Sequence, residues 1–196
     1  MQNSNNKFYF YDPSVRGYDD DVFKTISGTV IRVNNKIRLN KGSDSSGAIN
    51  STFMFTFGDL TYKLKVPTVP TSGDERFIGF YTRALGNRNS AYFYISGTNF
   101  YARSYSNDSD TAEQTTIAWN SDWTDTATEF KIIWRVNKVE FKIGDLIVAT
   151  HETKIPKQRL MPLYSSNNRD DEFDITFIEI VGAREILFAD TVNYTP

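Results

Sequence analysis

The side chains with the clearest chemical potential are aromatic and polar groups in the middle of the chain. Tyr92 and Tyr94 stand two residues apart, and Tyr101 and Arg103 repeat that spacing shortly afterwards. If these segments are strands, residues two apart share a face, so each pair lies on one surface. Tyrosine combines a flat apolar ring with a hydroxyl that can hydrogen-bond to a sugar. The pattern indicates a sugar-binding surface, with simple cross-strand packing of the rings as the alternative.

A second group of candidates lies in the polar loops around this region. Trp119 and Trp123 flank the run 120–122, whose Asn, Ser and Asp side chains could hydrogen-bond to a sugar packed on the indole. The alternative is that either tryptophan closes one end of the core, because tryptophan is usually largely buried. Arg88 and Asn89 lie in a loop that could border this sugar-binding surface and bind hydroxyls or a carboxylate. The alternative for them is an ordinary solvated loop.

Metal and nucleophile chemistry have few candidates in this chain. Asp19, Asp20 and Asp21 are consecutive, and Ca²⁺ takes about six to eight oxygen ligands. Their spacing is not that of an EF-hand, so we expect no cofactor, with a structural calcium at this cluster as the alternative. The chain has no cysteine, and His151 is its single histidine. Disulfides, thiolate catalysis and multi-histidine metal sites are therefore not expected, and His151 is interpreted as a strand-end residue.

Charge and hydropathy restrict the partners. The 196 residues include 22 Lys plus Arg against 24 Asp plus Glu, a net charge of −2, which gives no general attraction to nucleic acid. No run approaches the roughly 20 apolar residues that span a bilayer, so membrane insertion is not expected. Residues 1–7 are polar and have no apolar core of a signal peptide. The sequence leaves the location open, and extracellular, cell-surface and virion settings are the ones we consider.

The elements that must position these residues are strands. Phe130, Ile132 and Trp134 alternate with polar residues, as do Val139 and Phe141 after a short turn, which predicts a hairpin with one buried face. Similar runs predict strands at 28–33, 36–40, 53–57, 61–66, 76–82, 90–96, 99–104, 113–119, 146–150, 160–165, 173–181 and 184–189. Helical periodicity is almost absent, with one helical turn expected near 154–158. We therefore predict an all-β, two-sheet sandwich in one domain, 1–196, with its core at about 28–182.

Several of these strands resemble a known superfamily. The segments concerned are 57–67 (FGDLTYKLKVP), 130–134 (FKIIW), 139–151 (VEFKIGDLIVATH), 155–164 and 36–40. Their order and spacing are similar to those of the concanavalin A-like jelly rolls, which include laminarinase-type endoglucanases, legume lectins and laminin-G-like domains. The resemblance covers roughly residues 28 to 182 and implies a jelly roll of two antiparallel sheets.

The resemblance does not extend to the glucanase catalytic motif. Laminarinase-type relatives carry a Glu-x-Asp-x-x-Glu strand, because retaining hydrolysis needs two carboxylates about 5 to 5.5 Å apart. The equivalent strand should be 89–96, which contains no acid, and none occurs between Glu75 and Asp108. The Gln-x-His strand that the resemblance implies for jelly-roll polysaccharide lyases is also not matched around His151. We therefore lean toward a chain that is not an enzyme.

Three functions follow from these observations. The leading interpretation is a non-catalytic glycan-binding or adhesion module whose partner is a carbohydrate or glycoconjugate. The alternative is a structural subunit of a virion, tail fibre or surface assembly, in which the jelly roll contacts copies of itself or an assembly partner. The third is a diverged polysaccharide hydrolase or lyase with a displaced catalytic pair. The sequence leaves these three open.

Overall fold

The fold is described here from a computed structural model of the chain. The structure describes the backbone of residues 7–11, 23–27, 29–33, 36–40, 47–51, 54–65, 75–81, 89–106, 111–158, 160–166 and 173–185. In these residues the chain forms fifteen strands and one short helix. No helix among them is long and apolar enough to cross a membrane.

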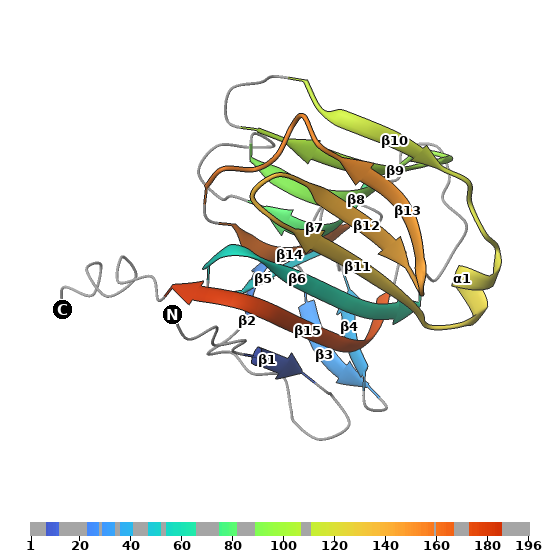
Figure 1. Cartoon of the computed structure of the whole chain (residues 1–196). Coiled ribbons are helices and arrows are strands. Elements are labelled where there is room, and N and C mark those ends of the chain that lie inside the picture. The colour runs from blue at the N-terminus through green and yellow to red at the C-terminus, as the bar shows by residue number, and fades with distance from the viewer. Residues whose placement is uncertain are drawn as a thin grey trace.

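The strands form two antiparallel sheets that face each other (Figure 1). The first contains β1 (Lys7–Tyr11), β3 (Thr29–Val33), β4 (Lys36–Asn40), β6 (Met54–Lys65), β11 (Thr128–Trp134), β12 (Val139–Ile143), β13 (Leu146–His151) and β15 (Phe173–Glu185). Its order is β13-β12-β11-β6-β15-β4-β3, and β1 pairs with β15. β13 is therefore one edge of this sheet.

The second sheet contains β2 (Phe23–Ser27), β5 (Gly47–Ser51), β7 (Glu75–Tyr81), β8 (Ser90–Ser96), β9 (Asn99–Tyr105), β10 (Glu113–Ile117) and β14 (Met161–Ser166). Its order is β10-β9-β8-β7-β14-β5-β2, so β10 is one edge. The helix α1 (Asp122–Asp125) follows β10 and leads into β11. The predicted all-β sandwich of two antiparallel sheets is confirmed.

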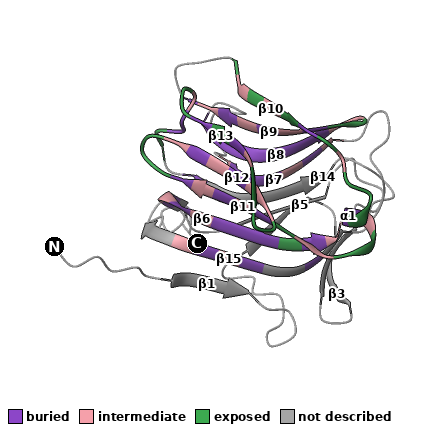
Figure 2. Ribbon diagram, turned by 45° about the vertical axis from the view of Figure 1, so that its right-hand side comes forward, coloured by how far each residue is buried: buried purple, intermediate pink, exposed green. Residues whose placement is uncertain are grey.

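The core lies between the sheets and is built by alternation along each strand. Figure 2 shows the buried residues concentrated on the central strands, whereas exposed ones gather on β10 and around β13. The predicted hairpin of β11 and β12 pairs in register, with Ile132 opposite Phe141 and Trp134 opposite Val139. These four side chains are buried. Burying each large apolar side chain contributes about 1.5 to 3 kcal/mol, so this alternation is the main source of stability.

One long strand replaces two that the sequence predicts. Residues 53–57 and 61–66 were expected to be separate, but β6 runs through Met54–Lys65 without a break. Its buried side changes phase, from Phe55 to Leu60, around Phe57, which has a φ of 62°. The pairing of β15 with β6 shifts register at the same level. A bulge of this kind rotates the strand, which explains why the two halves looked like independent strands.

The expected helical turn near 154–158 is wrong, and the helix forms instead at Asp122–Asp125. In the 154–158 segment the backbone groups bond to distant side chains. Lys154 N–H donates to Glu113 at 3.0 Å, and the Pro156 carbonyl accepts the indole N–H of Trp134 at 3.2 Å. Because these groups are already used across the fold, the local hydrogen bonds of a helical turn do not form.

Candidate functional site

The predicted tyrosine pairs lie on one face of the second sheet. Tyr94 of β8 is directly opposite Tyr101 of β9, and Tyr92 is opposite Arg103. The alternate residues of β8, Phe93 and Ile95, belong to the core between the sheets. The tyrosines therefore face away from that core, as the alternation predicts. We call the following set the tyrosine face: Phe77, Tyr92, Tyr94, Tyr101, Arg103 and Tyr105.

The rings of the tyrosine face form two stacked pairs. Tyr92 stacks on Tyr105, and Tyr94 on Tyr101, each with ring centroids 6.3 Å apart. Phe77 joins the pairs, with its centroid 4.8 Å from that of Tyr94. Tyr92 and Tyr94 are only 1% and 7% exposed, whereas the other three rings are half-buried. We call Tyr92 and Tyr94 the inner pair. The three outer rings pack on this pair and retain accessible surface.

Arg103 places a cation on these rings. Its guanidinium carbon lies 4.1 Å from the Tyr94 ring centroid and 5.1 Å from that of Tyr101. Its Nε donates a hydrogen bond to the Gln114 side chain on β10. The contacts with the two rings and this hydrogen bond hold the guanidinium in place, and its planar fork of donors suits hydroxyl or carboxylate acceptors.

The phenols of the inner pair remain protonated at neutral pH. Burial raises the pKa of Tyr92 well above its ordinary value, and burial likewise raises the pKa of Tyr94. The Tyr94 hydroxyl donates to Glu75 Oε1 at 2.8 Å, which further disfavours the phenolate. These tyrosines are therefore suited to hydrogen bonding and packing and poorly suited to act as a base.

Trp119 and Trp123 lie away from the tyrosine face. Trp123, in α1, is buried, with its ring centroid 5.2 Å from that of Phe100 and 5.8 Å from that of Phe130. Trp119 is half-buried, packs against Trp123 at 5.1 Å and contacts the same core. Both rings cover one end of the space between the sheets, which is the arrangement that the structural alternative describes.

The remaining candidates are placed as follows. Asn89 is buried, has a φ of 65°, and its Oδ1 accepts a hydrogen bond from Lys157 N–H at 3.4 Å. Asparagine tolerates this backbone region better than most residues, which gives it a structural role. Arg88 and the cluster of Asp19, Asp20 and Asp21 lie outside the described residues. In the part of the chain that is described, no group of three or more acidic or histidine side chains could hold a metal.

Sequence reasoning missed two residues on this side of the sheet, Phe77 and Glu75. Phe77 and Glu75 on β7 lie opposite Tyr94 and Ser96 on β8. The sequence signals a strand at 76–82, but only the register of β7 against β8 shows that Phe77 shares the side of the tyrosines. Hydrophobic alternation alone would have assigned Phe77 equally well to a core face.

His151 and Glu113 connect the neighbouring edges of the two sheets through hydrogen bonds. His151 ends β13, is buried, and its ring nitrogens lie 2.8 Å from Ser104 Oγ and 3.1 Å from Thr115 Oγ1, on the opposite sheet. The Glu113 carboxylate accepts hydrogen bonds from the 152–154 segment, including one from Thr153 N–H at 2.8 Å. Burial alone would raise the pKa of Glu113, but these hydrogen bonds lower it below its ordinary value. We call this edge, where β10 runs beside β13, the seam.

We expect the stability of the protein to fall as the pH is lowered from 7 to 5. Burial lowers the pKa of His151 below its ordinary value, with Glu113 acting in the opposite direction. As the pH falls, the unfolded chain therefore binds the proton first. The contribution of neutral His151 to stability is fully present above the unfolded pKa of about 6.5 and declines as the pH falls below it. Thermal unfolding of the wild type and His151→Gln across this range measures the effect. An equally steep decline in the variant would contradict the assignment.

Solved structures of known proteins share this architecture, although sequence comparisons find no relative. No family model matches the chain, and no curated protein is significantly similar to it in sequence. Among solved structures, the laminarinase catalytic domain from Thermotoga maritima MSB8 has a TM-score of 0.73 at 9% identity, over 91% of this chain and 98% of that one. A Bacillus licheniformis beta-glucanase has a TM-score of 0.69 at 13% identity, over 92% of this chain and 100% of that one. The apo Crh5 transglycosylase has a TM-score of 0.70 at 15% identity, over 91% of this chain and 85% of that one.

The fold is the concanavalin A-like jelly roll. The resemblance deduced from 57–67, 130–134 and 139–151 is therefore confirmed at the level of fold. In this jelly roll, β6 and β11 pair along residues 58–64, and β11 pairs with β12, so these segments form contiguous central strands.

Proposed function

We propose that this jelly roll is a carbohydrate-binding module and that glycan binds on the tyrosine face. The observation that carries the proposal is the row of half-buried rings beside a fixed guanidinium, on the sheet side opposite the core. Flat apolar rings with polar groups at their margins complement a pyranose, whose axial C–H groups form apolar patches between hydroxyls. The solved laminarinase and beta-glucanase of like fold are, by their names, glucan-active proteins.

We further propose that binding is non-catalytic. On the described residues of β7, β8, β9 and β10, Glu75 is the only carboxylate on the side of the tyrosine face. It is already hydrogen-bonded to Tyr94. Retaining and inverting glycosidases both use a pair of carboxyl groups flanking the scissile bond. A single engaged carboxylate supports recognition in preference to hydrolysis.

Tyr101 is the residue through which binding is best tested. We expect Tyr101→Ala to weaken binding of β-1,3- and β-1,4-linked gluco-oligosaccharides about tenfold, because a half-buried ring with accessible surface is removed from the face. Tyr101→Phe keeps the ring and is expected to retain most of the affinity. Isothermal titration, after a glycan array has selected the tightest ligand, measures both.

Val136→Ala provides the matched control, because Val136 is 76% exposed in the turn between β11 and β12. Its affinity should equal that of the wild type. Failure of the folded wild type to bind any glycan at millimolar concentration would overturn the proposal, as would unchanged binding in Tyr101→Ala.

Catalysis is tested separately by measuring the release of reducing ends from β-glucans. We expect no release above background from the wild type. Turnover that is lost in Glu75→Gln would show that the chain is a diverged hydrolase. The structural-subunit alternative stays a prediction, and light scattering that shows a monomer at high concentration would count against it. The calcium alternative at Asp19, Asp20 and Asp21 also stays a prediction, and a rise in melting temperature with added Ca²⁺ would support it.

A further inference from the structure

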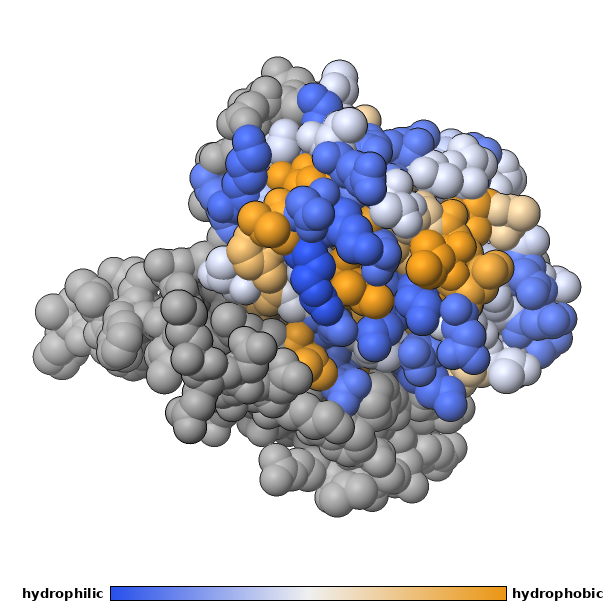
Figure 3. Space-filling view, viewed as in Figure 1, coloured by the Kyte–Doolittle hydropathy of each residue, from blue (hydrophilic) through white to orange (hydrophobic). Residues whose placement is uncertain are grey.

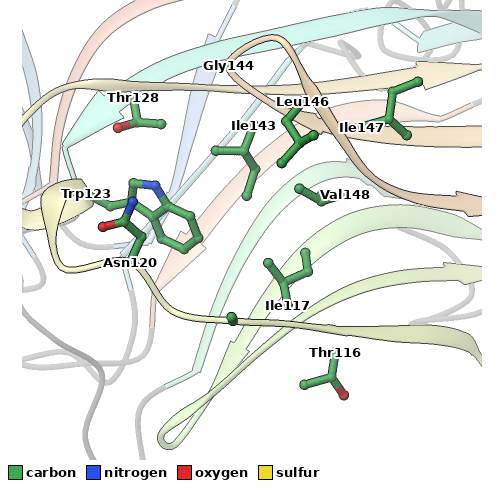
Figure 4. A pocket seen from close by; sticks show the side chains of 11 residues that line it. Thr116, Ile117, Asn120, Trp123, Thr128, Ile143, Gly144, Leu146, Ile147 and Val148 are labelled. Atoms are coloured by element: carbon green, nitrogen blue, oxygen red, sulfur yellow. The ribbon is translucent and has the colours of Figure 1, made fainter.

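A concave surface lies on the seam, apart from the tyrosine face. At one end of the seam, His151 and Glu113 hold β13 and β10 together through the hydrogen bonds described above. At the other end, where β10 leads to α1 and β12 turns into β13, the sheets leave a cavity of about 660 Å³ that is open to solvent (Figure 4). We call this cavity the seam pocket.

The walls of the seam pocket are mainly apolar. Six large apolar side chains from β10, α1, β12 and β13 line it: Ile117, Trp123, Ile143, Leu146, Ile147 and Val148. Leu146 and Ile147 are 68% and 50% exposed, so much of this lining contacts water. Apolar residues also gather in separate patches among hydrophilic ones on the face that Figure 3 shows. A ligand that covered the lining of the seam pocket would remove this apolar surface from water, which is favourable.

The polar groups of the seam pocket are uncharged. Thr116, Asn120 and Thr128 contribute hydroxyl and amide groups, and no lining residue carries a charge. Asn120 Oδ1 accepts a hydrogen bond from Asp122 N–H at 2.9 Å, which holds the amide at the start of α1. A charged ligand would lose hydration without meeting a counter-charge, so the lining selects for neutral molecules.

The walls are held in place by the fold. Gly144, in the turn between β12 and β13, has a φ of 58°, and its N–H donates to the Glu129 carbonyl at 2.8 Å. Trp123 is fixed from behind by Phe100 and Phe130. Fixed walls lose little conformational entropy when a ligand binds. Most of the free energy of apolar contact therefore contributes to affinity.

We propose that the seam pocket is a binding site for a neutral small molecule with an alkyl chain or aromatic ring. Its volume lies within the range of about 300 to 1,000 Å³ that is usual for small-molecule sites. The ligand packs its apolar part between Ile117 and the Leu146–Val148 segment and directs a hydroxyl or amide toward Asn120 or Thr128. The site uses none of the residues of the tyrosine face, so the proposal does not depend on glycan binding.

The test is a titration of the full chain with N-phenyl-1-naphthylamine, a neutral aromatic probe whose fluorescence rises in apolar surroundings. We expect saturable binding, weakened about tenfold by Leu146→Ser because the apolar contact of one large side chain is lost. Ala118→Phe, which adds a ring at an exposed lining position, is expected to weaken binding similarly. Val136→Ser removes a comparably exposed apolar side chain outside the pocket and should leave binding unchanged.

Three outcomes would overturn the proposal. The first is the absence of saturable binding by the folded wild type, and the second is equal affinity in the wild type, Leu146→Ser and Ala118→Phe. The third is concentration-dependent dimerisation of the wild type that displaces the probe and is abolished by Leu146→Ser, which would show that a second copy of the chain occupies the pocket. Sedimentation velocity on the same samples measures the third.

Discussion

Trp134→Ala is expected to lower the free energy of unfolding by about 3 to 5 kcal/mol, the usual cost of truncating a fully buried tryptophan. Trp134 is completely buried between the sheets. Its ring centroid lies 5.0 Å from that of Phe57 on its own sheet and 5.6 Å from that of Phe80 on the other. Loss of the indole therefore removes contacts that join the two layers and leaves a large cavity.

The indole also makes a polar contact that can be measured separately. Its N–H donates to the Pro156 carbonyl at 3.2 Å, in a buried setting. Trp134→Phe keeps most of the apolar volume but leaves that carbonyl without its donor. We expect this variant to lose about 1 to 3 kcal/mol, which is less than alanine loses. Urea unfolding followed by circular dichroism gives both values, and equal losses would show that packing volume is not the main term.

Gly79→Ala is expected to cost about 3 kcal/mol and to disturb the tyrosine face. A Cβ added at Gly79 would lie 2.4 Å from the carbonyl oxygen of Ala91 and 2.6 Å from the Cα of Tyr92. Both are backbone atoms of the adjacent strand, so no side-chain rotation relieves the clash. Because Tyr92 is directly opposite Gly79, β8 must move away and carry the inner rings with it.

Gly144→Ala is the matched control for Gly79→Ala. A Cβ at Gly144 meets nothing within 4 Å, but the φ of 58° there is unfavourable for alanine by roughly 1 to 2 kcal/mol. Gly144→Asn should recover part of that loss, because asparagine tolerates the left-handed region. Thermal unfolding ranks the variants, and near-ultraviolet circular dichroism reports the tyrosines. An unaltered tyrosine signal in Gly79→Ala would contradict the expected movement of β8.

The face of each central strand could be predicted from the sequence because alternation depends only on neighbouring residues. Phe130, Ile132 and Trp134 point inward as expected, and Tyr92 and Tyr94 point to the opposite side from Phe93 and Ile95. The phase change at Phe57 could not be predicted in this way, since it depends on a backbone φ that no hydrophobic pattern records. The helical turn expected near 154–158 failed for a related reason, because distant side chains there use the backbone groups.

The features of the candidate site also divide into those that local spacing predicts and those that depend on the tertiary structure. The sequence by itself determined the two-sheet architecture and the pairing of tyrosines by spacing, because a strand places every second residue on one side. Only the tertiary structure decided that Phe77 and Glu75 join Tyr94, that Trp123 is buried at the end of the core, and that Ile117 and Leu146 line one pocket. Strand register and the approach of the two sheet edges bring these residues together. Both depend on contacts between residues far apart in the chain.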